Sequence, residues 1–188
     1  MRFNLVFRDA IDPQDFTAFA EEQKWTFQGI HPAAESAPEE AVWATPTGVG
    51  VHLIDDEALG LIYVSLENYS IQGTRESDLR EASQSVSIRF GTIPPQELVD
   101  LYHAEPDWNG KVLALMMMAA SAGEFDANIC EAIEGGLKSP NADLRSAAAI
   151  GSMYTPWDEL RELVDSVSIS DPDDRVRDLA AMSLLNFA

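Results

Sequence analysis

The sequence predicts an α+β protein: a small N-terminal α/β-meander unit of order βαβββα, followed by an all-α solenoid of about three helical hairpins. Apolar residues alternate in short segments of the first half, which is typical of strands. In the second half apolar residues recur at helical spacing, and two stretches repeat at an offset of 32 residues. We place the boundary between residues 1–91 and residues 92–188, beside the pair Pro94-Pro95.

The N-terminal half is expected to open with a strand, a helix and a second strand. Apolar side chains alternate in RFNLVF, residues 2–7, which predicts the first strand. Asp12 suits an N-cap and Pro13 suits the first helical residue, so a helix should follow. The second strand is expected in WTFQGI, which starts at Trp25.

The rest of this half is predicted to be a loop, a meander and a closing helix. HPAAESAPEE, residues 31–40, is rich in Pro, Ala and acids and should form a surface loop. Three meander strands are expected in AVWAT, VGVHLI and LIYVSLE, with turns between them. TRESDLREASQSVSIRF should be helical through about Ser85, because Val86, Ile88 and Phe90 beyond it alternate like a strand.

The second half repeats one phrase. SDPDDRVRDLAAMSLL, residues 170–185, matches SPNADLRSAAAIGSM, residues 139–153, at its proline, its arginine and its small apolar residues. A third copy, residues 105–123, is degenerate, because its proline is shifted and Leu113 stands where the arginine is expected. Another helical segment precedes each copy, so the repeating unit is a helical hairpin. One hairpin cannot bury its apolar face alone, and such hairpins are therefore expected to stack.

The residues of this phrase resemble a known repeat family. DPDDRVRDLAAMSLL, an Asp-Pro turn followed by Val-Arg and apolar residues, resembles the second helix of a HEAT-like repeat. The resemblance covers about residues 92–188 and implies that a turn acid and a helix arginine bond between neighbouring repeats. It therefore implies structural roles for Asp173, Arg177 and Arg145, with Asn141 replacing the acid in the second copy. The resemblance implies little about function.

No pattern of catalytic residues or metal ligands stands out. No glycine-rich loop leads into an expected helix, so phosphate binding is unsupported. His52 precedes the acidic turn at residues 55–57, but a strand followed by a turn need not bring these side chains together. Cys130 lies within an expected helix and suits a buried apolar position better than a nucleophile. We therefore expect no enzyme activity, no metal and no cofactor.

Charge is the unusual property of the composition. The chain has 32 Asp and Glu against 12 Lys and Arg, a formal charge of −20. Such a charge repels nucleic-acid phosphates and anionic lipid surfaces, and it attracts basic proteins. Many bacterial proteins are acidic for solubility alone, which is the alternative. With one cysteine, no apolar run near 18 residues and no signal peptide, the expected location is the cytoplasm.

These observations predict a non-enzymatic protein-binding module that presents an acidic surface to a basic partner. A narrower hypothesis is an immunity or antitoxin protein that neutralises a basic toxin. The alternative is an accessory or scaffold subunit of an enzyme or of a larger assembly, as in bilin lyases with HEAT-like repeats. A DNA glycosylase with such repeats is disfavoured, because DNA binding requires a basic groove.

Two acidic surfaces are candidates for partner binding, and an ordinary solvated face is the alternative for each. The first is the acidic loop formed by Asp55, Asp56 and Glu57. The second is the first helix of the last hairpin, with the residues Trp157, Asp158, Glu159, Glu162 and Asp165. Removal of single charges at the rim of such a surface should mainly slow association.

Overall fold

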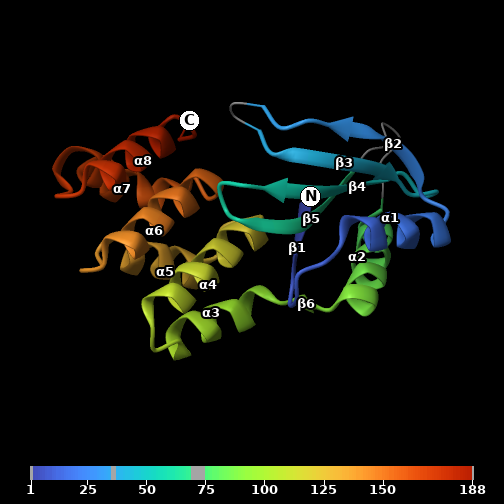
Figure 1. The fold of residues 1–188 in the computed structure, drawn as a ribbon, viewed down its shortest axis with the longest axis horizontal. Helices are drawn as coiled ribbons and strands as arrows, with labels where there is room; N and C mark the ends of the chain where they lie inside the picture. Colours follow the sequence, from blue (N-terminus) through green and yellow to red (C-terminus); the bar gives the residue numbers. More distant parts are fainter. Residues whose placement is uncertain (1, 35–36, 69–74, 188) are drawn as a thin grey trace. The chain divides into compact units, whose positions relative to one another are not determined.

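The computed structural model describes residues 2–34, 37–68 and 75–187. Its N-terminal part contains an antiparallel sheet of six strands, and its C-terminal part is helical, which confirms the predicted α+β fold class (Figure 1). The chain divides into two units, Met1–Ile93 and Pro94–Ala188. We call them the sheet unit and the helical unit and describe each by itself.

The sheet has the strand order β2-β3-β4-β5-β1-β6, and every neighbouring pair is antiparallel. The strands are β1 Arg2–Phe7, β2 Thr26–His31, β3 Glu39–Ala44, β4 Val49–Asp56, β5 Leu61–Asn68 and β6 Thr92–Ile93. The predicted order βαβββα is two strands short of the structure, although the individual segments above had predicted a strand at each of β1 to β5. The strand that no segment predicted is β6, which follows the second helix. β6 has two residues, too few to show alternation in the sequence. β3 begins at Glu39, inside the stretch that was expected to be a loop.

Two helices, α1 Pro13–Glu22 and α2 Glu76–Phe90, contribute to one core with the sheet. Alternate residues of β4 and β5 supply the sheet side of this core, as period-2 side-chain orientation requires. α2 continues past Ser85 to Phe90, so the strand-like alternation at its end was misleading. Val86 is buried on the same helical stripe as Leu79, and the Phe90 ring stacks 5.3 Å from that of Phe16. Burial of this stripe favours the helix over the strand.

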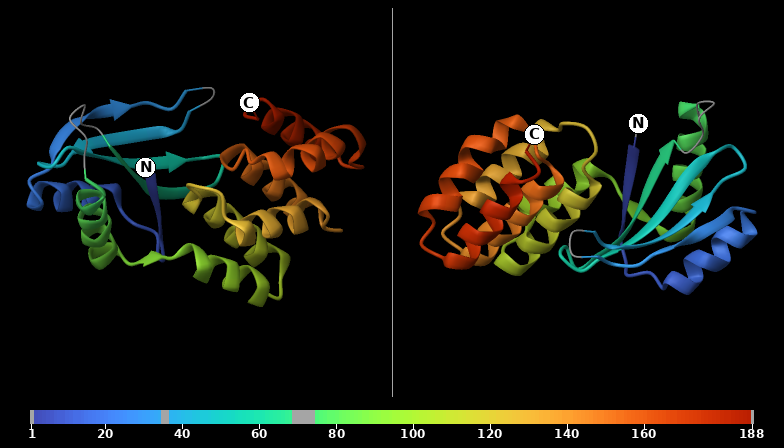
Figure 2. Two further views of the ribbon diagram at one scale, coloured as in Figure 1. Left: turned by 180° about the vertical axis from the view of Figure 1, so that it is seen from behind. Right: turned by 90° about the horizontal axis from the view of Figure 1, so that it is seen from above.

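The helical unit consists of three stacked hairpins. Its helices are α3 Pro95–Ala104, α4 Trp108–Ser121, α5 Ala127–Leu137, α6 Ala142–Tyr154, α7 Asp158–Ser170 and α8 Asp174–Leu184. Each odd-numbered helix pairs with the next one to form a hairpin. The hairpins stack so that each helix packs on the equivalent helix of the neighbouring hairpin. α4 packs on α6 and α6 on α8, while α3 packs on α5 and α5 on α7 (Figure 2).

Small residues allow the helices of neighbouring hairpins to approach closely. A Cβ atom placed on Gly136 of α5 would lie 2.8 Å from the Ala148 Cβ on α6 and from the Leu115 Cδ1 on α4. A Cβ on Gly151 of α6 would lie 3.1 Å from the other methyl group of Leu115. The three helices therefore meet at Leu115, which is fully buried.

Candidate functional site

The three hairpins turn through the same short pattern, a residue that carries a side-chain oxygen, a proline, and then Asp or Asn. These turns are residues 105–107, 139–141 and 171–173, and together they form what we call the turn end. In each turn the third side chain accepts a hydrogen bond from an amide in the first turn of the following helix. The first side chain accepts one from the amide of the third residue. The turns are thus structurally equivalent caps.

This equivalence corrects the alignment of the degenerate copy, residues 105–123. With the turns superposed, Lys111 falls at the position of Arg145 and Arg177, each four residues after its cap. Leu113 is therefore not the counterpart of the arginine. The Lys111 Nζ donates a hydrogen bond of 3.2 Å to the Tyr102 backbone carbonyl oxygen. It also lies 4.9 Å from the centroid of the Tyr102 ring. The basic residue of each copy ties its own helix to the backbone at or just before the turn.

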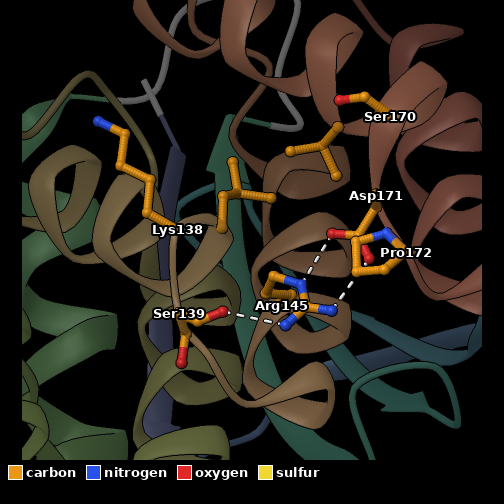
Figure 3. A pocket seen from close by; sticks show the side chains of 8 residues that line it. Lys138, Ser139, Arg145, Ser170, Asp171 and Pro172 are labelled. Atoms are coloured by element: carbon orange, nitrogen blue, oxygen red, sulfur yellow. Dashed lines mark hydrogen bonds and ion pairs between the residues drawn. The ribbon is translucent and has the colours of Figure 1, made fainter.

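Arg145 also joins two hairpins through a buried, bidentate ion pair with Asp171 (Figure 3). Its Nε donates to Asp171 Oδ2 at 2.7 Å and its Nη2 donates to Oδ1 at 3.0 Å. The Nη1 donates to the Ser139 carbonyl oxygen at 3.0 Å, so each of the three guanidinium nitrogens donates a hydrogen bond. Burial alone would raise the pKa of Asp171, but the hydrogen bonds from Arg145 and from the Asp173 amide, with the nearby charges, lower it.

The turn acid that pairs with a helix arginine of the neighbouring repeat is consequently Asp171, not Asp173 as the resemblance implied. Asp173 accepts a hydrogen bond from the Arg175 amide and caps α8. Arg177 donates to the Asp171 carbonyl oxygen and pairs with Asp174. The sequence position that could have shown this is the residue before the proline, where Ser139 and Asp171 match at the offset of 32.

A surface pocket of about 310 Å³ lies at the turn end, around this ion pair. Its lining residues are Leu137, Lys138, Ser139, Arg145, Val167, Ser170, Asp171 and Pro172. The charged groups of the lining are paired within the chain, since Arg145 bonds to Asp171 and the Lys138 Nζ lies 2.9 Å from Glu134 Oε2. This pairing favours a structural role for the turn end.

A second pocket, of about 470 Å³, lies at the opposite end of the helical unit, where loops connect one hairpin to the next. We call this the loop end, and its pocket is lined by Phe125, Pro156, Trp157, Asp158, Glu159 and Asn186. Phe125 and Trp157 stand at equivalent repeat positions, 32 residues apart, and each is followed by Asp. Their ring centroids lie 5.2 Å apart at an interplanar angle of 72°. The repeated aromatic-Asp pair is visible in the sequence but was not among the predicted site residues.

The acidic residues of α7 continue from this pocket along the helix surface. Asp158, Glu162 and Asp165 fall at i, i+4 and i+7 and are exposed, while Leu160 and Val164 face the core. We call these three acids the α7 strip. The Asp158 side chain is 94% exposed, and its carboxylate lies 3.9 Å from the Arg161 Nε. The structure thus brings together the predicted residues of the last hairpin, with Glu159 and Trp157 in the pocket itself.

The other predicted surface, the acidic loop of the sheet unit, is only partly available. Asp56 is 2% exposed, and its Oδ1 accepts hydrogen bonds from the amides of Ala58 and Leu59. Its carboxylate therefore stabilises the turn between β4 and β5. Asp56 is thus not available to bind a partner, contrary to the prediction. Asp55 and Glu57 are exposed.

His52 and Cys130 are the remaining residues that the sequence singled out for chemistry. The His52 ring lies between two acids outside the predicted acidic loop, 2.6 Å from Glu40 and 3.2 Å from Glu67. No group of three or more His, Cys, Asp or Glu suited to a metal ion occurs among the described residues. Cys130 is buried, and burial, followed by the charges of Glu134 and Glu159, raises the pKa of its thiol.

Comparisons with protein-family models, with curated proteins and with solved structures gave no match to this chain. Across residues 2–34, 37–68 and 75–187 there is also no helix of the length and apolarity that a membrane crossing requires.

Proposed function

We propose that this protein is a non-enzymatic protein-binding module whose acidic loop end binds a basic protein. The observation that carries the proposal is the coincidence of exposed acids and exposed aromatic rings. The α7 strip leads into a pocket whose walls include Phe125, 51% exposed, and the partly exposed Trp157. Partly exposed aromatic residues surrounded by polar groups are typical of the residues that dominate binding energy at protein interfaces.

The charge of the helical unit supports a basic partner. Residues 94–188 contain seventeen acidic and six basic residues, and Arg145 is already engaged with Asp171. A negative field of this kind accelerates association with a positively charged protein by about 10- to 1,000-fold at low salt. The same field disfavours phosphate backbones.

The narrower proposal is an immunity or antitoxin protein that neutralises a basic toxin, built on HEAT-like repeats. The three stacked hairpins and the buried Arg145–Asp171 pair support the HEAT-like part of this proposal. A small, acidic binding module that holds a cytoplasmic toxin inactive would need no catalytic groups of its own.

The test begins with the partner captured from the source cell, purified and mixed again with the intact protein. We expect a basic partner, an affinity that falls as salt is raised, and an association rate that falls at least tenfold when the α7 strip is neutralised. The strip variant is Asp158→Asn, Glu162→Gln and Asp165→Asn combined. The matched control, Asp100→Asn, Glu131→Gln and Asp178→Asn, removes the same charge from exposed positions on other helices.

The proposal is overturned if the partner is acidic, if the affinity is insensitive to salt, or if strip and control variants slow association equally. The alternative function, an accessory or scaffold subunit, is favoured by two exposed apolar side chains of the last hairpin. Met182 is 57% exposed and Leu185 is 85% exposed. Under that alternative, Met182→Ser with Leu185→Ser would release the chain from a larger assembly, and neutralising the strip would not.

A further inference from the structure

We infer that the loop-end pocket receives an arginine side chain of the basic partner. The inference rests on the proposed function and adds the site and the side chain that would be recognised. The pocket is open to solvent and large enough for a guanidinium with part of its aliphatic stem, at about 470 Å³. Its walls combine two aromatic rings with two carboxylates, the two kinds of group that bind a guanidinium best.

The aromatic wall favours a flat cation. Phe125 and Trp157 meet edge to face, so the contact between them covers a face of only one of the two rings. A guanidinium is planar and weakly hydrated, and it stacks on indole faces more readily than the compact, strongly hydrated ammonium of lysine. The chain already contains one such contact on α7, where the Arg161 guanidinium lies 5.5 Å from the centroid of Phe187.

The carboxylate wall supplies the charge and the hydrogen-bond acceptors. Asp158 and Glu159 are adjacent at the start of α7, and both line the pocket. The Arg161 Nε lies 3.9 Å from the Asp158 Oδ1, which is longer than a hydrogen bond. A guanidinium from a partner can donate two parallel hydrogen bonds to one of these carboxylates, a geometry that lysine cannot provide.

The helix ends around the pocket cancel, so its carboxylates decide its sign. The start of α7, and the start of α5 two residues after Phe125, each contribute a partial positive charge of about +0.5, which alone would attract an anion. Pro156 and Asn186, however, each lie two residues after the end of a helix, α6 and α8, whose carboxyl ends contribute about −0.5 each. With two carboxylates added, the pocket is clearly negative and suits a cation.

The experiment uses the intact protein and three capped peptides: hexa-arginine, hexa-lysine and hexa-citrulline, the neutral analogue of arginine. Binding is followed by fluorescence anisotropy and by the indole N–H resonance of Trp157. We expect hexa-arginine to bind about threefold or more tighter than hexa-lysine, hexa-citrulline not to bind, and the Trp157 resonance to shift with hexa-arginine. The peptides separate the contribution of charge from that of the planar guanidinium.

Variants then locate the site. Trp157→Leu and Asp158→Asn should each weaken hexa-arginine about fivefold or more, and Trp157→Phe should restore most of the loss caused by Trp157→Leu. Glu131→Gln, an equal loss of charge on the exposed surface of α5, should change the affinity less than twofold. Trp157→Phe also keeps the test valid if Trp157→Leu fails to fold.

The outcomes separate this inference from the proposed function. If neither cationic peptide binds, the acidic-surface proposal itself fails. If both bind but Glu131→Gln weakens them as much as Asp158→Asn does, and Trp157 does not shift, the surface stands and the pocket is refuted. If hexa-arginine and hexa-lysine bind equally through Trp157, the preference for arginine is refuted.

Discussion

The two ends of the helical unit use the same residue types in opposite ways. At the turn end the side chain of Asp171 is 4% exposed and accepts both hydrogen bonds of an arginine fork. At the loop end the side chain of Asp158 is 94% exposed and has a basic neighbour only at 3.9 Å among the contacts described. The acidic residues of the helical unit therefore fall into two groups: buried carboxylates that pair within the fold and exposed carboxylates that face solvent.

The difference has an energetic consequence. A buried, bidentate ion pair leaves an uncompensated charge when one partner is removed, which is costly, whereas an exposed acid remains hydrated whether or not it is paired. The turn end should therefore control stability, and the loop end should control binding. The same hairpins position both ends.

The largest expected effect is on the turn end. Arg145→Ala leaves Asp171 buried without its partner and should lower the free energy of unfolding by about 3–5 kcal/mol, measured in urea. Arg175→Ala is the control, because Arg175 pairs with Asp143 of the neighbouring hairpin on the exposed surface. That variant should cost at most about 1 kcal/mol, with less effect at high salt. Equal losses in the two variants would contradict the distinction between buried and exposed pairs.

Acid should weaken the same pair. Since the pKa of Asp171 is lowered in the folded state, the pair stabilises the protein fully above the unfolded value of about 3.9 and loses that stabilisation as pH falls through the folded pKa. The difference in unfolding free energy between the wild type and Asp171→Asn should therefore be constant near neutral pH and shrink below about pH 4. A difference that shrinks already between pH 5 and pH 6 would show that the carboxylate of Asp171 is not held in its charged form.

A smaller effect is expected where the hairpins press together between the two ends. Gly136→Ala places a methyl group 2.8 Å from the Ala148 Cβ, which belongs to a rigid helix, and should cost about 1–3 kcal/mol of unfolding free energy. Gly135→Ala is the matched control on the same helix, where the nearest atom is the Tyr102 hydroxyl at 3.8 Å. Helix propensity should make that control stabilising by about 0.5–1 kcal/mol. If Gly136→Ala were also stabilising, the close stack of α4, α5 and α6 would be wrong.

The sequence was sufficient for the fold class and for the hairpins, because both depend on apolar periodicity that is visible over many residues. It was insufficient where a single contact between distant residues decides a role. In the sequence Asp171 is one acid of an Asp-Pro turn. Only the structure shows that Arg145 of the previous hairpin reaches it and forms a buried ion pair with it. Asp56 likewise looked exposed, but its carboxylate turns back onto the backbone of its own turn.

At the candidate site the sequence named some of the residues that line the loop-end pocket and left out others. The acids of α7 and Trp157 were identified from the sequence, because an amphipathic helix shows which residues face solvent. Phe125 was not predicted, because it lies in a loop, where no periodicity shows its contacts. Its place in the pocket follows from its contact with the ring of Trp157. The aromatic-Asp pair at the offset of 32 was present in the sequence and could have indicated this contact.

The most direct measurement compares two variants that each remove one carboxylate charge, Asp171→Asn and Asp158→Asn, in urea unfolding and in hexa-arginine binding. We predict opposite outcomes: the first variant unfolds much more easily and keeps its peptide affinity, and the second keeps its stability and loses affinity. If both variants lost stability and affinity together, the claim that the turn end controls stability and the loop end controls binding would be wrong.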